Sequence, residues 1–155
     1  MTSVFHDPND VHALKCELAV EVLRSCGTLR LQVTGWSMLP TVWPGDTLMI
    51  ESARTSGVNQ GDIVLFGRER RLFVHRVVKK LGNSKLVTCG DAMSAPDPVI
   101  DQHELLGRVS SIQRNGRCIA PRRRQSFSER AIAGLVSNSQ IAARVLVGLR
   151  GGHQI

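Results

Sequence analysis

The hydrophobic periodicity of this sequence changes at Gly27, and that change limits the possible folds more than any other feature. Residues 8–26 carry apolar side chains at helical spacing. Asp7 can cap such a helix, Pro8 suits its first turn, and Gly27 is a typical stop. The pattern predicts an amphipathic helix that packs on a sheet through one face, formed by Val11, Leu14, Leu18 and Val22 with Ser25 or Cys26.

From Thr28 to Ala120 the apolar residues instead occur in short runs, separated by Gly, Pro and Asn. Alternation with a period of two within such runs is typical of half-buried β-strands. The predicted strands are centred on residues 29–33, 48–50, 63–66, 72–78, 86–88 and 105–112. The sequence therefore predicts a mainly β fold class.

Three consecutive arginines at residues 122–124 separate the β region from a C-terminal tail. Ser126 or Ser128 can cap an Ala-, Ile-, Leu- and Val-rich segment that we expect to form one or two short helices. The chain thus divides into a helical segment over residues 1–27, a β domain over residues 28–120 and a basic, apolar tail over residues 121–155.

The 155 residues suffice for one modest core, and their formal net charge is +7. Residues 1–60 contain four basic and six acidic side chains, so the positive charge belongs to the rest of the chain. A basic surface suits nucleic acid, an anionic membrane or an acidic peptide. Aromatic residues make up only 4% of the chain, which disfavours a stacking platform for single strands, and we expect no nucleic-acid partner.

The cysteines form no C-x-x-C pair and have no metal-ligand spacing with the histidines. The N-terminus lacks the apolar segment of a secretory signal, and no stretch reaches the ~18 apolar residues of a membrane span. We therefore expect reduced thiols, a cytoplasmic location, no metal and no cofactor. The four cysteines are Cys16, Cys26, Cys89 and Cys118.

The segment most informative about chemistry is TGWSMLPT at residues 34–41, followed by PGD at residues 44–46. Ser37 there lies in a tight turn after a predicted strand, where its hydroxyl can be exposed and nearby N–H groups can bind an oxyanion. A serine in such a loop is more often only a turn residue. A catalytic role therefore requires a base and an orienting carboxylate elsewhere in the chain.

His75 is the candidate base. The alternation of its predicted strand puts Phe73, His75 and Val77 on one face. Apolar neighbours would leave the imidazole partly desolvated and neutral near pH 7, and the alternative is a structural histidine satisfied by a carboxylate. Asp91 and Asp97 lie in a turn-rich loop, and either carboxylate could hold the imidazole N–H.

Together these segments resemble the ordered sequence boxes of the signal peptidase I family, over about residues 29–112. The boxes are GWSMLPT at residues 35–41 with GD at 45–46, GDIV at 61–64, VHRVV at 74–78, TCGDA at 88–92 and GRV at 107–109. The resemblance implies a mostly β catalytic domain in which Ser37 attacks a peptide carbonyl. It also implies substrate or oxyanion contacts for Gly35, Met38 and Pro40.

The resemblance further indicates which base is used. Bacterial members and the self-cleaving SOS-repressor relatives have a Lys in the strand box, whereas the endoplasmic-reticulum and archaeal branch has a His. This sequence has His75 there, which implies a Ser-His-Asp arrangement with Asp91 as the first candidate for the acid and Asp97 as the second. Lys79 and Lys80 follow by roughly 13 to 17 Å along an extended strand, and we interpret them as solvated charges.

Three positions depart from the family pattern. An amphipathic helix stands where members normally have a membrane anchor. Gly35 stands where some members have a Ser that helps bind the oxyanion, which leaves backbone N–H groups and Thr34 as donors. Cys89 stands where a Lys is common.

We therefore expect a soluble serine endopeptidase that cleaves a peptide or protein precursor. One alternative is a non-catalytic module that binds an extended peptide by β-addition. Another is a self-cleaving regulator, although about 28 residues before the β domain are too few for a helix-turn-helix. The tail, with Arg122–Arg124 and Arg130 beside apolar segments at 131–136 and 141–149, either covers the core or binds an anionic membrane surface or a partner protein.

Overall fold

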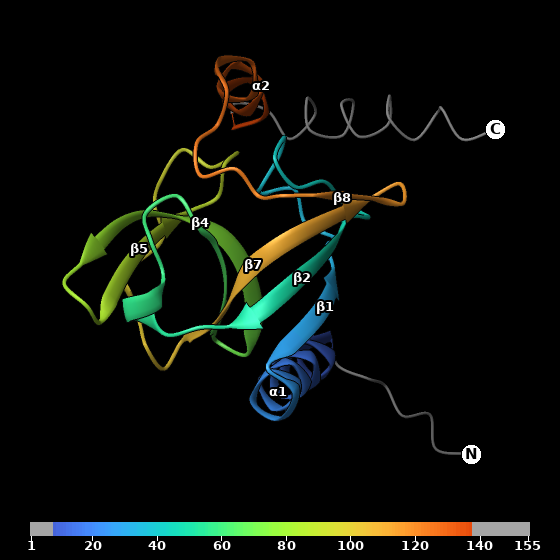
Figure 1. Ribbon diagram of the computed structural model, residues 1–155, viewed down its shortest axis with the longest axis vertical. Coiled ribbons are helices and arrows are strands. Elements are labelled where there is room, and N and C mark those ends of the chain that lie inside the picture. The colour runs from blue at the N-terminus through green and yellow to red at the C-terminus, as the bar shows by residue number, and fades with distance from the viewer. Residues whose placement is uncertain (1–7, 138–155) are drawn as a thin grey trace.

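The structure, a computed structural model, describes residues 8–137, in which eight strands form one antiparallel sheet (Figure 1). The strand order is β1-β2-β7-β3-β4-β5-β6, and β8 pairs with β7. The mainly β fold class is confirmed. The elements in chain order are α1 (Pro8–Cys26), β1 (Thr28–Gln32), β2 (Thr47–Ser52), a 3-10 turn (Thr55–Gly57), β3 (Ile63–Arg68), β4 (Arg71–Leu81), β5 (Lys85–Cys89), β6 (Ile100–Asp101), β7 (Leu105–Arg114), β8 (Arg117–Ile119) and α2 (Phe127–Ser137).

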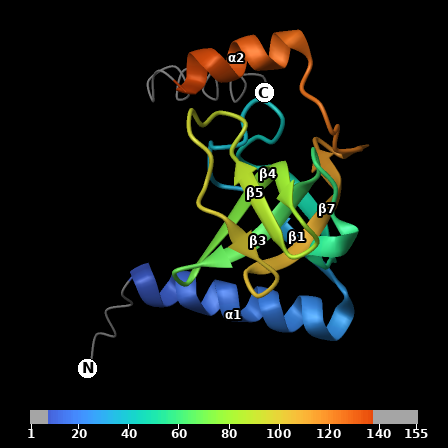
Figure 2. The same cartoon turned by 90° about the vertical axis from the view of Figure 1, so that its left-hand side faces the viewer.

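The two helices lie at opposite ends of the sheet (Figure 2). α1 begins at Pro8 and ends before Gly27, whose φ of 72° and N–H bond to the Leu23 carbonyl close the helix as predicted. α2 begins with a capping box, because Ser126 and Glu129 exchange side-chain bonds to each other's backbone N–H. In the described part of the chain, neither helix combines the length and the apolar character that crossing a bilayer requires.

β3 lies at the centre of the core because both of its faces are buried. Ile63 and Leu65 point into a cluster with α1, β2 and β7, and Val64 and Phe66 point into a second cluster with β4, β5 and β6. This explains the uninterrupted apolar run of β3, since a strand covered on both faces needs no polar side. A third, smaller cluster packs α2 on the loops around Leu39 and Ala92 through Ile132 and Val136.

The buried face of α1 differs from the predicted one. Leu14 and Leu18 are 53% and 55% exposed. The helix approaches the sheet closely where Cys16 packs on Gly67. The Cys16 Sγ atom lies only 3.1 Å from the position that a Cβ on Gly67 would occupy, so a larger residue at either position would not fit without a shift. Close packing on small residues therefore outweighs the burial of the larger leucines. The fully buried side chains of α1 are Ala13, Ala19 and Leu23.

The predicted strands are present, and two short ones escaped the sequence pattern. β6 has two residues and β8 has three, too few for alternation to show. The capping residue Asp7 and the segment at 141–149 lie outside the described residues. The expected attachment of the tail to a membrane or partner stays a prediction, while its first helix packs on the core.

Two strand edges remain free beside the catalytic candidates. β4 pairs with β3 over residues 71–76, but its pairing with β5 begins only at Arg76. Residues 71–75 therefore have no strand on their second side within the described chain. Among the described strands, β1 pairs with β2 alone and also leaves one edge unpaired. Both strands run toward the turn that carries Ser37, so their free edges frame a groove that leads to it.

Candidate active site

Ser37 lies in the turn between β1 and β2, and a second loop fixes its backbone. The N–H of Ala92 donates to the Ser37 carbonyl at 2.8 Å. Gly90 allows this contact, because a Cβ at that position would lie 2.6 Å from the same carbonyl oxygen. The glycine of the TCGDA segment is therefore required by close approach, and it holds the two loops together.

His75 lies on β4 with its ring directed at Ser37. The distance from His75 Nε2 to Ser37 Oγ is 3.0 Å. The His75 side chain is only 6% exposed and packs beside the rings of Phe66 and Phe73, with centroids 5.9 and 6.1 Å away. These apolar neighbours limit the positions that the ring can take. A neutral imidazole held in this way can accept a proton from the serine hydroxyl.

Asp97 contacts the other nitrogen of the imidazole. His75 Nδ1 lies 2.6 Å from Asp97 Oδ2, and the Thr88 hydroxyl donates to the same oxygen at 2.7 Å. The Asp97 N–H in turn donates to the Thr88 carbonyl at 2.8 Å. When Nδ1–H donates to the carboxylate, the lone pair of Nε2 faces Ser37. The buried Thr88, which sequence analysis placed only within a family box, therefore orients the Asp97 carboxylate.

An ion pair supports the chain just after Asp97. The Arg68 guanidinium bonds to the Glu104 carboxylate at 2.6 and 2.9 Å and donates to the carbonyls of Pro98 and Val99 at 3.1 and 2.8 Å. This hydrogen bonding lowers the pKa of the Glu104 carboxyl and raises the pKa of Arg68. The pair was not found from the sequence, because its members are 36 residues apart and meet only in the folded chain.

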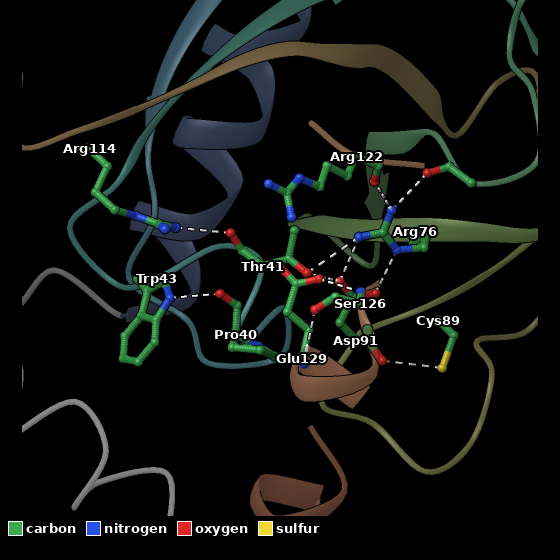
Figure 3. A network of polar contacts seen from close by, with 12 residues as sticks. Pro40, Thr41, Trp43, Arg76, Cys89, Asp91, Arg114, Arg122, Ser126 and Glu129 are labelled. Carbon is green, nitrogen blue, oxygen red and sulfur yellow. Dashed lines mark hydrogen bonds and ion pairs between the residues drawn. The ribbon is translucent and has the colours of Figure 1, made fainter. Parts of the chain in front are cut away.

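Asp91 does not contact His75, which corrects the preference for it as the orienting acid. Its carboxylate receives two hydrogen bonds from the Arg76 guanidinium, at 2.8 and 2.7 Å, and one from the Thr41 hydroxyl (Figure 3). Successive residues of a strand point to opposite faces, so Asp91 meets the face of Arg76 rather than that of His75. The Asp91 side chain is 4% exposed, and the pair is buried.

Arg76 also ties this network to other parts of the chain. Its guanidinium donates to the carbonyls of Gly61 and Arg122 at 2.9 and 2.6 Å. Arg114 likewise donates to the Thr41 carbonyl at 2.9 Å (Figure 3). The turn after Ser37 is thus held by charged groups on its buried side.

Of the three residues predicted to contact substrate or oxyanion, two line the groove beside Ser37 and one does not. Gly35 and Met38 line the groove beside Ser37, with Met38 otherwise buried in the core. Pro40 lies outside the groove, and its carbonyl accepts the Trp43 indole N–H at 2.7 Å (Figure 3). Within residues 8–137, the backbone N–H groups of Ser37 and Met38 have no hydrogen-bond acceptor. They are the available donors for an oxyanion.

A cavity of about 660 Å³ occupies the groove between β1, β4 and α1 and ends at Ser37 and His75. Its wall along the two strands is mostly apolar, and α1 also lines it. The apolar side chains that line it include Leu29, Leu31, Val33, Leu72 and Val74. A groove of this length and lining can hold an extended peptide.

Other candidate groups do not reach the serine. Lys79 is exposed, and the Lys80 ammonium donates to the Val58 carbonyl. Burial, followed by the charges of Asp97 and Asp91, raises the pKa of the Cys89 thiol, which favours an unreactive side chain. In the described part of the chain, no three His, Cys, Asp or Glu residues gather as a metal site.

A family model described as Peptidase S24-like matches residues 9–110, which extend from α1 into β7 and include Ser37, His75 and Asp97. No curated protein gives a significant match to the chain.

Proposed function

The chain belongs to the Peptidase S24-like family, and on this premise we propose that it is a serine endopeptidase with Ser37 as nucleophile, His75 as general base and Asp97 as the orienting carboxylate. The observation that carries the proposal is the continuous line of polar contacts from Ser37 Oγ to His75 Nε2, at 3.0 Å, and from His75 Nδ1 to Asp97 Oδ2, at 2.6 Å. This line has the geometry of a Ser-His-Asp triad.

The three side chains and two backbone N–H groups divide the reaction among them. His75 Nε2 takes the Ser37 hydroxyl proton as Oγ attacks the peptide carbonyl, and Asp97 stabilises the imidazolium that forms. The N–H groups of Ser37 and Met38 bind the developing oxyanion. The imidazolium then gives its proton to the leaving amine, which leaves an acyl-enzyme on Ser37. Water, deprotonated by His75, hydrolyses this ester and restores the serine.

The resemblance to the histidine branch of the signal peptidase I family supports a histidine base. The position of Lys79 and Lys80 supports the same choice, because Lys79 is exposed and Lys80 is engaged by the Val58 carbonyl. The free edges of β1 and β4 favour a peptide bound in extended form, with its backbone paired to residues 71–75. We therefore propose a peptide or protein precursor as the substrate.

The test uses a fluorophosphonate probe, which forms a stable bond to an activated serine, together with mass spectrometry of a peptide library. Wild-type protein should be labelled on Ser37 and should cleave peptides, and Ser37→Ala should do neither. Ser94→Ala is the matched control, because Ser94 is an exposed serine in the loop before Asp97. Labelling that survives Ser37→Ala would refute the assignment.

The same spectra test the self-cleaving alternative. A self-cleaving regulator would convert the intact chain to two fragments during incubation without any added peptide, and Ser37→Ala would prevent it. Peptide cleavage by an intact chain would instead support an enzyme that acts on other molecules. A folded wild-type chain that neither labels nor cleaves would favour the non-catalytic peptide-binding module.

A further inference from the structure

The end of the cavity away from Ser37 has a distinct charge. The titratable side chains that line the cavity are His12 and Lys15 of α1, and Arg71 and His75 of β4. Among the residues that the structure describes, no carboxylate lines it. Apart from the candidate base, every ionisable group of the groove is therefore a cation or a potential cation.

Contacts between α1 and the β3–β4 hairpin bring the basic groups to the same end. A Cβ on Gly67 would lie 3.1 Å from Cys16 Sγ and 3.9 Å from the Arg71 carbonyl oxygen. Lys15 precedes Cys16 on α1, so its backbone lies beside the start of β4. Lys15 and Arg71 consequently flank one mouth of the cavity, from two different elements.

In the described part of the chain, Lys15 and Arg71 have no anionic partner, whereas several arginines of the sheet do. Within residues 8–137 no hydrogen bond or ion pair engages the side chain of Lys15 or of Arg71. Four sheet arginines do pair with carboxylates: Arg68, Arg76, Arg108 and Arg114. The basic mouth of the groove therefore keeps its positive charge available to a ligand.

The strand geometry sets the distance from this mouth to the reacting groups. Arg71 and His75 are four residues apart on β4, which corresponds to roughly 13 Å of extended chain. A peptide that pairs with the same strand edge covers this span with about four of its own residues. The intervening wall is apolar, through Leu72, Val74 and Leu31.

We propose that Lys15 and Arg71 form a subsite for an acidic side chain, located about four residues from the scissile bond of a peptide whose intervening residues are apolar or small. The proposal rests on the proposed function, since it names the substrate class of the same groove. His12 adds to the positive charge of this subsite when it is protonated.

The subsite is tested by binding, which does not require catalysis. Fluorescent ten-residue Ala/Val peptides that carry one Glu at each position in turn are titrated into the Ser37→Ala variant, with Gln peptides as the uncharged reference. We expect one Glu position to bind about tenfold more tightly than its Gln counterpart at low salt, from two partly exposed ion pairs of about threefold each. The preference should shrink in 1 M salt, where charges are screened within ~3 Å.

The charge-reversed variant K15E/R71E, in the same Ser37→Ala background, should lose the Glu preference, and Lys79→Glu should keep it. Lys79 is the matched control because it is an exposed lysine of β4 outside the cavity. Circular dichroism and thermal melting verify that each variant is folded. Equal binding of Glu and Gln peptides at every position, absence of any binding, or a preference that survives in K15E/R71E would overturn the subsite.

Failure of the subsite and failure of the proposed function remain distinguishable. Fluorophosphonate labelling of Ser37 without a Glu preference refutes the subsite and leaves the peptidase. A Glu preference in a chain whose Ser37 never labels keeps the subsite and refutes the peptidase. Where both hold, mass spectrometry of the cleaved Glu peptides should place the acidic residue about four positions from the cut.

Discussion

Replacing Asp97 and Asp91 separately by Asn distinguishes the carboxylate that serves the reaction from the one that stabilises the fold. Asp97→Asn keeps the size of the side chain but removes the negative charge 2.6 Å from His75 Nδ1. Loss of the orienting acid of a Ser-His-Asp triad costs about 10⁴ in kcat. The Asp97 side chain is 22% exposed and partly screened by water, so we expect kcat/KM to fall roughly 10²- to 10⁴-fold.

Asp91→Asn should act mainly on stability. Arg76 and Asp91 have side chains that are 9% and 4% exposed, so the variant leaves a buried guanidinium without its counter-charge. Removing one partner of such a pair costs about 3 to 5 kcal/mol of the free energy of unfolding. In a chain of this size that lowers the melting temperature by about 10 °C or more. The folded molecules should retain kcat/KM within about tenfold of wild type.

The assay is cleavage of an internally quenched peptide, measured well below the melting temperature of every variant. Fluorophosphonate labelling counts the active molecules, so that kcat refers to folded protein alone. Thermal melting monitored by circular dichroism gives the stability of each variant. A larger loss of kcat/KM in folded Asp91→Asn than in Asp97→Asn would refute the assignment and restore Asp91 as the orienting acid.

Four further outcomes follow from the structure. Arg68→Gln should lower kcat about tenfold with KM nearly unchanged, because it loosens the chain beside Asp97. Stopped-flow or steady-state kinetics measures both constants, and a change in KM instead of kcat would contradict this role. The ion pair with Arg68 lowers the pKa of the Glu104 carboxyl, so the stability that this pair adds is present above the ordinary Glu pKa and is lost as pH falls below it. The difference in melting temperature between wild type and Glu104→Gln should therefore shrink toward pH 3. Gly90→Ala should reduce both labelling of Ser37 and melting temperature, because its Cβ would overlap the Ser37 carbonyl oxygen, and an unchanged rate of labelling would contradict this. Since burial raises the pKa of Cys89, timed iodoacetamide labelling at pH 8 should modify it after the two exposed cysteines, Cys26 and Cys118.

Local sequence patterns determined much of this protein. The period of 3.6 between Pro8 and Gly27 and the period of two beyond it identify the N-terminal helix and the main strands, because each pattern reflects the face that a regular element buries. Ser126 and Glu129 form the capping box of α2 through contacts three residues apart. The turn around Ser37 and the strand around His75 are local features of the same kind.

Tertiary structure alone decided which groups meet across those elements. The family resemblance favours Asp91 over Asp97, but Asp91 pairs with Arg76 on one face of β4 while Asp97 reaches His75 on the other. The face that α1 buries was likewise set by tertiary contacts, since Cys16 packs on Gly67 while Leu14 and Leu18 stay exposed. Such choices depend on the register of paired strands and on the space between packed surfaces. Residues distant in the chain settle both, so no local pattern contains them.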